Sequence, residues 1–140
     1  TPPGGGTTDY AVEIFYDAIK HGRYTCFLKP GTQLPMMYMP DAIKGAIAIM
    51  NANPSNLKQR NAFNVSAMSF SPEDIAAEIK KFIPEFVMDY NIDPLRQSIA
   101  DSWPNSIDDS VARQEWGWEP EYDLPRMCRD LIQQLRLKLT

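Results

Sequence analysis

Apolar side chains recur along this chain at the spacing of helices with one buried face. Near the N-terminus they form a run in which neighbours on one helical side are three or four residues apart: Ala11, Ile14, Phe15, Ala18 and Ile19. Thr7 or Thr8 precedes this run as the expected N-cap, and Gly22 follows it as the expected end. The pattern therefore predicts an amphipathic first helix between these positions.

Two later helices have clear starts. Residues 71–74 read Ser-Pro-Glu-Asp, a capping serine followed by proline and two acids, which is typical of a helix N-terminus. The buried face expected after it consists of Ile75, Ile79, Phe82 and Ile83, and Pro84 stops the helix. Asp123 and Pro125 begin the last helix, whose apolar stripe is Leu124, Met127, Cys128, Leu131, Ile132 and Leu135. A shorter helix is expected to end at Gly117, between two tryptophans that we interpret as structural.

The remaining pattern mixes strands and helices. Extended runs at 24–28 and 35–39 flank a turn sequence at 29–32, which either joins them as neighbours or merely separates them. A helix is expected after Asp41, with Ile43, Ala46, Ile47 and Met50 on one side, and a short helix at 94–100. Alternating residues predict two more strands, one at Phe63 and Val65 and one at Phe86, Met88 and Tyr90. The expected architecture is one domain of mixed α and β structure.

Composition narrows the function classes. The net charge is −4, and the Lys and Arg residues are scattered without a basic, aromatic-rich run, so nucleic acid and anionic membranes are disfavoured as partners. No apolar stretch approaches the roughly 20 residues that span a bilayer, so we expect a soluble protein. Cys26 and Cys128 each lie in an apolar pattern, which favours buried free thiols in a reducing compartment. His21 is the single histidine, and it lies next to Gly22 at the expected end of the first helix. Metal sites and catalytic triads that require histidine are therefore poorly supported.

The first six residues, Thr-Pro-Pro-Gly-Gly-Gly, have the composition of a flexible connection between two parts of an enzyme. We therefore expect further polypeptide before Thr1. The three glycines do not follow a strand at the spacing Gly-x-Gly-x-x-Gly, so they do not predict a dinucleotide site. They do offer backbone N–H groups at the start of the first helix, where a carboxylate can bind.

Four strings carry a resemblance to a known family: residues 3–11 (PGGGTTDYA), 34–38 (LPMMY), 64–70 (NVSAMSF) and 99–104 (IADSWP). In this order, and with the Trp-Gly-Trp sequence near the C-terminus, they resemble the carboxyl-terminal portion of the short-chain type of L-threonine 3-dehydrogenase. The resemblance covers nearly the whole chain. It implies the mixed α+β substrate-binding portion of an extended Rossmann-type short-chain dehydrogenase, related to the sugar-nucleotide epimerases.

The resemblance also implies what is missing. In that family an amino-terminal Rossmann portion binds NAD and carries the catalytic Tyr-x-x-x-Lys pair, and the whole enzyme oxidises the β-hydroxyl of L-threonine to give 2-amino-3-ketobutyrate. That portion lies upstream of Pro3 and is not in this chain, which alone is expected to be inactive. Tyr16 and Lys20 match Tyr-x-x-x-Lys by chance, because the family's pair precedes the glycines. We therefore assign no catalytic, cofactor-binding or metal-binding residue to the chain.

The substrate-binding residues that we predict are Gly6, Thr7, Thr8 and Trp103. The backbone N–H groups around Gly6 and the two threonine hydroxyls suit one end of a zwitterionic substrate, although Thr7 or Thr8 can equally serve only as a helix cap. Trp103 lies in a loop before Pro104, where it can either cover a bound amino acid or anchor the core.

Weaker candidates have simpler structural readings. Asp101 can accept a hydrogen bond from an ammonium group but more often bonds its own backbone at such a position. Arg96 can pair with an acid or a phosphate, and a solvated helix position is the simpler reading. Met36 and Met37 end a strand and are expected to pack in the core.

Three functions stay open. The first is part of an NAD-dependent L-threonine dehydrogenase, with L-threonine and the amino-terminal portion as partners, a homodimer as the complete enzyme, and a mitochondrial or bacterial cytoplasmic location. The second is the substrate portion of a nucleotide-sugar epimerase or dehydratase, which needs basic residues around a diphosphate. The third is a non-enzymatic module that binds a small ligand.

Overall fold

The structure is a computed structural model that describes residues 4–58 and 61–139, so the first three residues of the expected flexible connection lie outside it. It is an α/β fold. The helices are η1 (Thr7–Asp9), α1 (Tyr10–His21), α2 (Met39–Asn51), η2 (Pro54–Asn56), α3 (Pro72–Lys80), α4 (Pro94–Asp101), α5 (Ser110–Trp116) and α6 (Leu124–Leu139). The strands are β1 (Arg23–Cys26), β2 (Leu34–Met36), β3 (Met68–Phe70) and β4 (Val87–Tyr90).

The strands form two small pairs rather than one sheet. β1 runs parallel to β4, with Arg23 opposite Val87, and β2 runs antiparallel to β3, with Leu34 opposite Phe70. The turn at 29–32 therefore separates β1 from β2 instead of joining them as a hairpin. Each strand finds its partner across at least 30 residues of chain, which is a distance that local sequence patterns do not report.

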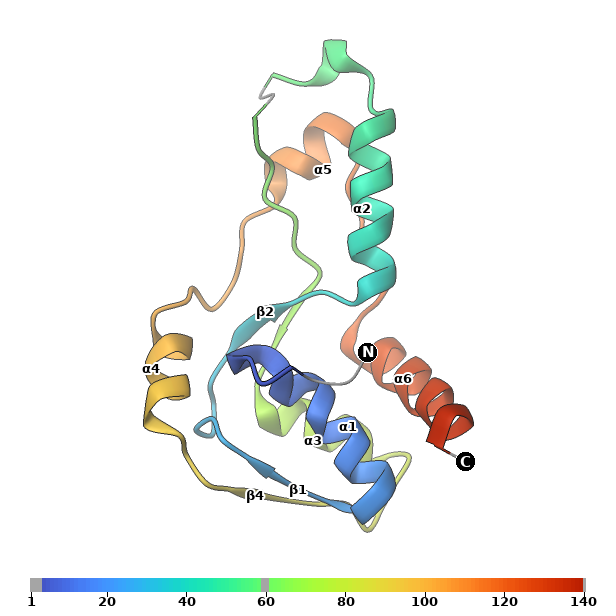
Figure 1. Ribbon diagram of the computed structural model, residues 1–140. Coiled ribbons are helices and arrows are strands. Elements are labelled where there is room, and N and C mark those ends of the chain that lie inside the picture. The colour runs from blue at the N-terminus through green and yellow to red at the C-terminus, as the bar shows by residue number, and fades with distance from the viewer. Residues whose placement is uncertain (1–3, 59–60, 140) are drawn as a thin grey trace.

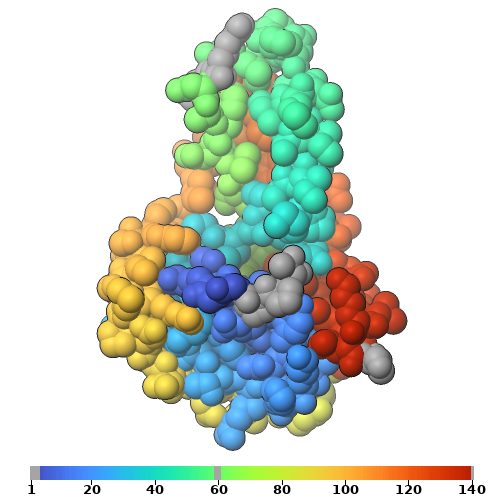
Figure 2. Space-filling view, in the orientation of Figure 1, coloured from blue at the N-terminus to red at the C-terminus, as the bar shows by residue number. Residues whose placement is uncertain are grey.

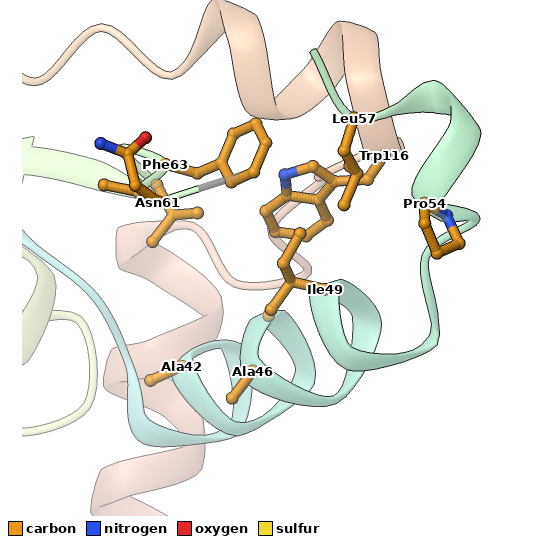
Figure 3. Close-up of a pocket in the computed structure, with 11 residues that line it drawn as sticks. Ala42, Ala46, Ile49, Pro54, Leu57, Asn61, Phe63 and Trp116 are labelled. Atoms are coloured by element: carbon orange, nitrogen blue, oxygen red, sulfur yellow. The ribbon is translucent and has the colours of Figure 1, made fainter. Parts of the chain in front are cut away.

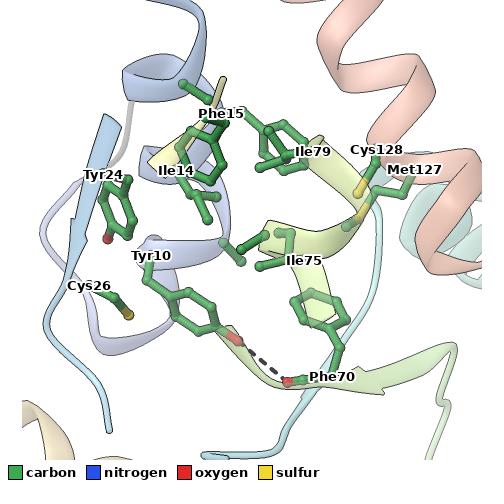
Figure 4. Packing of buried hydrophobic residues seen from close by; sticks show 14 of the residues in the cluster. Tyr10, Ile14, Phe15, Tyr24, Cys26, Phe70, Ile75, Ile79, Met127 and Cys128 are labelled. Carbon is green, nitrogen blue, oxygen red and sulfur yellow. Dashed lines mark hydrogen bonds between the residues drawn. The ribbon is translucent and has the colours of Figure 1, made fainter. Parts of the chain in front are cut away.

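One hydrophobic core lies among α1, α3, α6 and the strands (Figure 4). Its largest fully buried apolar side chains are Tyr10, Ile14, Phe15, Leu28, Leu34, Phe70, Ile75, Ile79, Phe86 and Ile132. The Tyr10 hydroxyl, buried at the centre, donates to the carbonyl oxygen of Phe70 at 3.4 Å. Cys26 and Cys128 are buried free thiols, as the sequence predicts, and burial raises their pKa values to about 11 and about 12.

The predicted helix boundaries are confirmed in part. α2 begins at Met39, ahead of Asp41, and Pro40 lies in its first turn. α3 ends at Lys80 and not at Pro84. Ser71 accepts a hydrogen bond from the Asp74 amide at 3.3 Å, and Asp123 accepts one from the Arg126 amide at 2.8 Å, so both act as N-caps. Gly22 and Gly117 end α1 and α5 in the left-handed conformation. The expected threonine cap is wrong, because Thr7 and Thr8 lie inside η1 and neither side chain caps α1.

A second lobe stands apart from this core. Figure 1 shows α2 and α5 side by side above the rest of the molecule, with residues 52–58 and 61–67 beside them. Few of its side chains are buried. The lobe is held by a close contact between Gly45 and Trp118, where a Cβ on Gly45 would meet the indole ring at 2.9 Å. The indole N–H of Trp118 donates to the Ser66 carbonyl at 2.8 Å. Two expectations fail in this lobe. The residues around Phe63 and Val65 form no strand, and the apolar side of α2 is exposed.

Asp41 connects the two lobes. Its side chain is 1% exposed, and its two carboxylate oxygens accept hydrogen bonds from the backbone amides of Glu121 at 2.8 Å and Tyr122 at 3.0 Å. Asp41 therefore joins the first turn of α2 to the segment that leads into α6. Lys44 supports the same junction through an exposed ion pair with Glu121 at 2.9 Å.

Candidate substrate-binding site

The glycine segment folds around a carboxylate that belongs to this chain. The amides of Gly4, Gly5 and Gly6 donate to Asp9 Oδ2 at 2.7, 2.7 and 2.9 Å. Gly5 has φ of 94°, a conformation in which a side chain is strained, so glycine is needed there. The hydrogen bond from Gly6, together with those from Gly4 and Gly5, lowers the pKa of Asp9 below its ordinary value.

This arrangement changes the role expected for the backbone. The sequence suggests that the N–H groups around Gly6 bind a substrate carboxylate, but in the structure the Gly6 amide already binds Asp9. A second negative group at this place would be repelled by the Asp9 charge. The same argument applies to a dinucleotide phosphate, so the triple glycine does not fit the cofactor either.

Thr7 and Thr8 are half-buried in η1, and Thr8 lines a cavity of about 640 Å³. The cavity lies between α1, the connection from β2 to α2, and α6; its lining includes Thr8 and Asp9 on one side, Met36, Met37 and Tyr38 above them, and Asp130 and Lys138 from α6. Most of this lining is apolar, with a few convergent polar groups, which is the usual character of a small-molecule site.

Tyr38 is the most constrained polar group in the cavity. Its hydroxyl donates to Asp130 Oδ2 at 2.7 Å, and its ring packs edge-on against Tyr122 at 4.9 Å between centroids. Burial, followed by the hydrogen bond to Asp130, raises the pKa of Tyr38 well above its usual range. Tyr38 therefore stays protonated near neutral pH and acts as a hydrogen-bond donor, not as a base.

Trp103 lies on a neighbouring element. It follows α4, which is in contact with η1, but Trp103 is not among the residues that line the 640 Å³ cavity. The Trp103 amide donates to the Ala100 carbonyl at 3.1 Å, and its side chain is 42% exposed. This exposure argues against the core-anchoring reading. Figure 2 shows the blue glycine segment and η1 on one face of the molecule, between the yellow-orange α4 and the red α6.

The weaker candidates have structural partners. Asp101 accepts a hydrogen bond from the Gln97 side chain at 2.6 Å, and the Arg96 guanidinium stacks over the Phe27 ring at 4.2 Å. Met36 and Met37 are half-buried. Lys20 lies over the Tyr16 ring at 5.7 Å, which is a cation–π contact within α1.

Sequence reasoning missed Asp9 as a site residue. A signal was present, because an Asp three residues after a glycine can turn back and accept hydrogen bonds from the preceding amides. The described residues include no cluster of three or more His, Cys, Asp or Glu that could hold a metal ion. Among the same residues, no helix has the length and hydropathy needed to cross a membrane.

Comparison with known proteins identifies relatives of this chain. No protein-family model matches the chain. The mitochondrial L-threonine 3-dehydrogenase of Bos taurus is 52% identical over 130 residues, which are 93% of this chain and 35% of that protein. An uncharacterized epimerase/dehydratase of Staphylococcus haemolyticus is 52% identical over 97% of this chain and 43% of its own length.

Solved structures agree with these relatives. The L-threonine dehydrogenase of Clostridium difficile superposes with a TM-score of 0.96 and 55% identity, over 99% of this chain and 43% of that chain. The L-threonine dehydrogenase of Phytophthora infestans superposes with a TM-score of 0.95 and 53% identity, over 99% of this chain and 44% of that chain. An NAD-dependent NDP-hexosamine 5,6-dehydratase, 12% identical with a TM-score of 0.67, shares the fold alone.

The chain thus has the fold of the carboxyl-terminal portion of an extended short-chain dehydrogenase. It spans about 43% of the length of most of these relatives and corresponds to their carboxyl-terminal part. Within that class it is homologous to the L-threonine 3-dehydrogenases and to the epimerase/dehydratases that resemble them.

Proposed function

We propose that this chain is the substrate-binding part of an NAD-dependent dehydrogenase that oxidises the β-hydroxyl of L-threonine to give 2-amino-3-ketobutyrate. The observation that carries the proposal is the position of Thr7, Thr8 and Asp9. They follow the glycine segment in a chain that is 52–55% identical to L-threonine dehydrogenases, and Thr8 and Asp9 line one cavity. The cofactor and the proton-transferring residues would come from an amino-terminal portion like that of these relatives.

The polar groups at this site complement a zwitterionic amino acid. Asp9 Oδ2 is held by the three amides, which leaves Oδ1 outside this set of bonds. A fixed carboxylate is the natural partner of the substrate ammonium group, and threonine hydroxyls can donate to the substrate carboxylate. Trp103 would cover the bound substrate and exclude water. Thr7, Thr8, Asp9 and Trp103 would thus position L-threonine and leave the chemistry to the other portion.

The second candidate function, a nucleotide-sugar epimerase or dehydratase, is favoured by the names of the staphylococcal relatives. A diphosphate needs converging cations. Within the described residues, Lys138 is the basic group that lines the 640 Å³ cavity, while Asp9 and Asp130 supply negative charge there. This balance favours a small amino acid over a nucleotide-sugar.

The proposal is tested in a fusion protein, in which this chain replaces the matched carboxyl-terminal part of the C. difficile enzyme. Purified fusion protein is expected to reduce NAD in the presence of L-threonine, followed as NADH absorbance. UDP-sugars are expected to give no turnover. A folded fusion protein that binds NAD but does not oxidise L-threonine would contradict the proposal. Epimerisation of a nucleotide-sugar would support the second candidate function instead.

We predict that Thr8→Ala in the fusion protein weakens the use of L-threonine far more than NAD binding. Loss of one hydrogen bond to a charged substrate group corresponds to about 1.5–3 kcal/mol, or roughly 10- to 150-fold in kcat/KM. Initial rates over a range of threonine concentrations give this ratio, and NAD titration gives the control value. Thr8→Ser keeps the hydroxyl and is expected to retain most of the activity. Equal losses for threonine and NAD would contradict a substrate contact.

We further predict that Trp103→Ala lowers turnover because the substrate is less well covered. Since Trp103 is 42% exposed, the same change is expected to alter stability by less than about 1 kcal/mol. Leu95→Ala, at an exposed apolar position of α4, is the matched control. Full activity of the Trp103 variant would remove this residue from the site.

A further inference from the structure

The apolar side of α2 has no partner among the residues that the structure describes. Met39, Ile43, Ile47 and Met50 follow one another at spacings of four, four and three, so they share one side of the helix. Their exposed fractions are 65%, 54%, 50% and 75%. Asp41 and Gly45, on the opposite side, are the buried residues of α2. An amphipathic helix ordinarily buries its apolar side, and this one exposes it.

A groove continues this exposed side. It has a volume of about 530 Å³ and lies between α2, α5 and residues 54–57 and 61–65 (Figure 3). Ala46 and Ile49 of α2 form one wall, and Phe63 and Trp116 lie across from them. At 100° per residue, Ala46 is next to the row of exposed side chains on the circumference of the helix. The row and the groove therefore form one apolar surface, which we name the α2 face.

The segment at 61–65, which borders the groove, also lacks a partner strand among the described residues. Phe63 and Val65 alternate with polar residues as a strand does, yet no strand pairs with them in the described residues. The Trp116 indole N–H is buried and has no hydrogen-bond partner among the same residues. A buried donor without an acceptor is uncommon in the interior of a complete protein.

We infer that the α2 face is the docking surface for the amino-terminal portion that the homologous dehydrogenases carry before the matched region. The matched region covers 43–44% of the solved C. difficile and P. infestans chains and is their carboxyl-terminal part, so more than half of each chain precedes it. A TM-score of 0.96 over 99% of this chain means that the lobe of α2 keeps the same arrangement there. The α2 face therefore has the arrangement that it has in a chain that also carries the preceding portion.

The path of the chain favours this occupant. Figure 2 shows α2 and the glycine segment on the same face of the molecule, so polypeptide joined ahead of the glycines would start on the face that α2 shares. Docking removes four large apolar side chains from water, and each such side chain contributes about 1.5–3 kcal/mol when fully buried. This inference rests on the proposed function, because the docked portion is the one expected to hold the cofactor.

Hydrogen–deuterium exchange compares the fusion protein with this chain alone. We expect amides of α2 and of residues 61–67 to exchange at least about tenfold more slowly in the fusion protein. Amides of α3, which belong to the core of this chain, serve as the internal reference. Unchanged exchange in both α2 and 61–67 would overturn the inference. Protection in a fusion protein that does not oxidise threonine would support docking and count against the proposed function alone.

A matched pair of variants tests the surface itself. The double variant Ile43→Gln with Ile47→Gln is expected to leave the Tm of the isolated chain nearly unchanged and to lower that of the fusion protein by about 5 °C or more. Leu137→Gln, at an 80% exposed position of α6, is the control and is expected to lower neither. Equal Tm values for the double variant and the control in the fusion protein would contradict docking. A dimer of the isolated chain that Ile47→Gln dissociates would assign the α2 face to a second copy instead.

Discussion

Replacing Asp9 by alanine in the fusion protein is expected to lower kcat/KM for L-threonine about a hundredfold while NAD binding stays close to its original strength. Two losses act together. The amides of Gly4, Gly5 and Gly6 lose the acceptor that holds them at 2.7–2.9 Å, and the site loses the carboxylate proposed to face the substrate ammonium group. Steady-state kinetics and NAD titration measure the two quantities.

Asp9→Asn separates these two losses. The amide oxygen of asparagine can still accept hydrogen bonds from the glycine N–H groups, but the charge is gone. If the charge binds the substrate, the asparagine variant behaves like the alanine variant. If Asp9 only orders the glycine segment, the asparagine variant keeps most of the activity. Activity at the original level in both variants would exclude Asp9 from the site.

The pH dependence of this segment follows from the direction of its pKa shift. The glycine amides lower the pKa of Asp9 below the ordinary value of 3.8, because they stabilise the charged form. The stabilisation is therefore complete above that ordinary value and is lost as the pH falls through the lowered pKa. Amide chemical shifts of Gly4, Gly5 and Gly6 are expected to be constant from pH 5 to pH 8, to change only in stronger acid, and to lose this pattern in Asp9→Ala.

Asp41→Ala is expected to lower the free energy of unfolding by about 2–3 kcal/mol, the largest effect on stability among the substitutions considered. The variant removes the acceptor of the amides of Glu121 and Tyr122, which the carboxylate binds at 2.8 and 3.0 Å. A charge-assisted hydrogen bond contributes about 1.5–3 kcal/mol, and relief of the buried charge offsets part of the sum. Urea unfolding followed by circular dichroism gives the difference.

Asp89→Ala is the matched control for Asp41. Asp89 pairs with Arg23 at 2.9 Å, but half of its side chain is exposed, and such pairs contribute at most about 1 kcal/mol. A loss in the Asp41 variant no larger than in this control would show that the junction between the lobes does not depend on the buried carboxylate.

The confirmed predictions concern features that a few neighbouring residues decide. Ser71 caps α3 because its side chain reaches an amide three residues ahead, and Gly117 ends α5 because glycine adopts positive φ without strain. The final helix was predictable because its apolar residues recur every three or four positions, so that each lies about one helical turn from the next. These interactions are visible in the printed sequence, since their partners are close in the chain.

The failures concern partners that are distant or absent. Val65 has the pattern of a strand, but a strand requires a neighbouring backbone, and none is paired with it in the described residues. The row from Met39 to Met50 has the pattern of a core-facing helix side, but it faces outward while Gly45 meets Trp118. Periodicity reports which residues share a side of a helix, not what covers that side.

By itself the sequence determined the main helices, the caps at Ser71 and Asp123, the free thiols and the resemblance to threonine dehydrogenases, because all of these depend on residue type and local spacing. Only the tertiary structure decided that β1 pairs with β4, that Asp41 joins the two lobes, and that Asp9 occupies the glycine amides. Those features depend on which groups meet in space. Even the contact between Asp9 and Gly6, which are only three residues apart, is not decided by spacing alone. Each glycine amide has several possible acceptors, and the side-chain torsions determine which acceptor it meets.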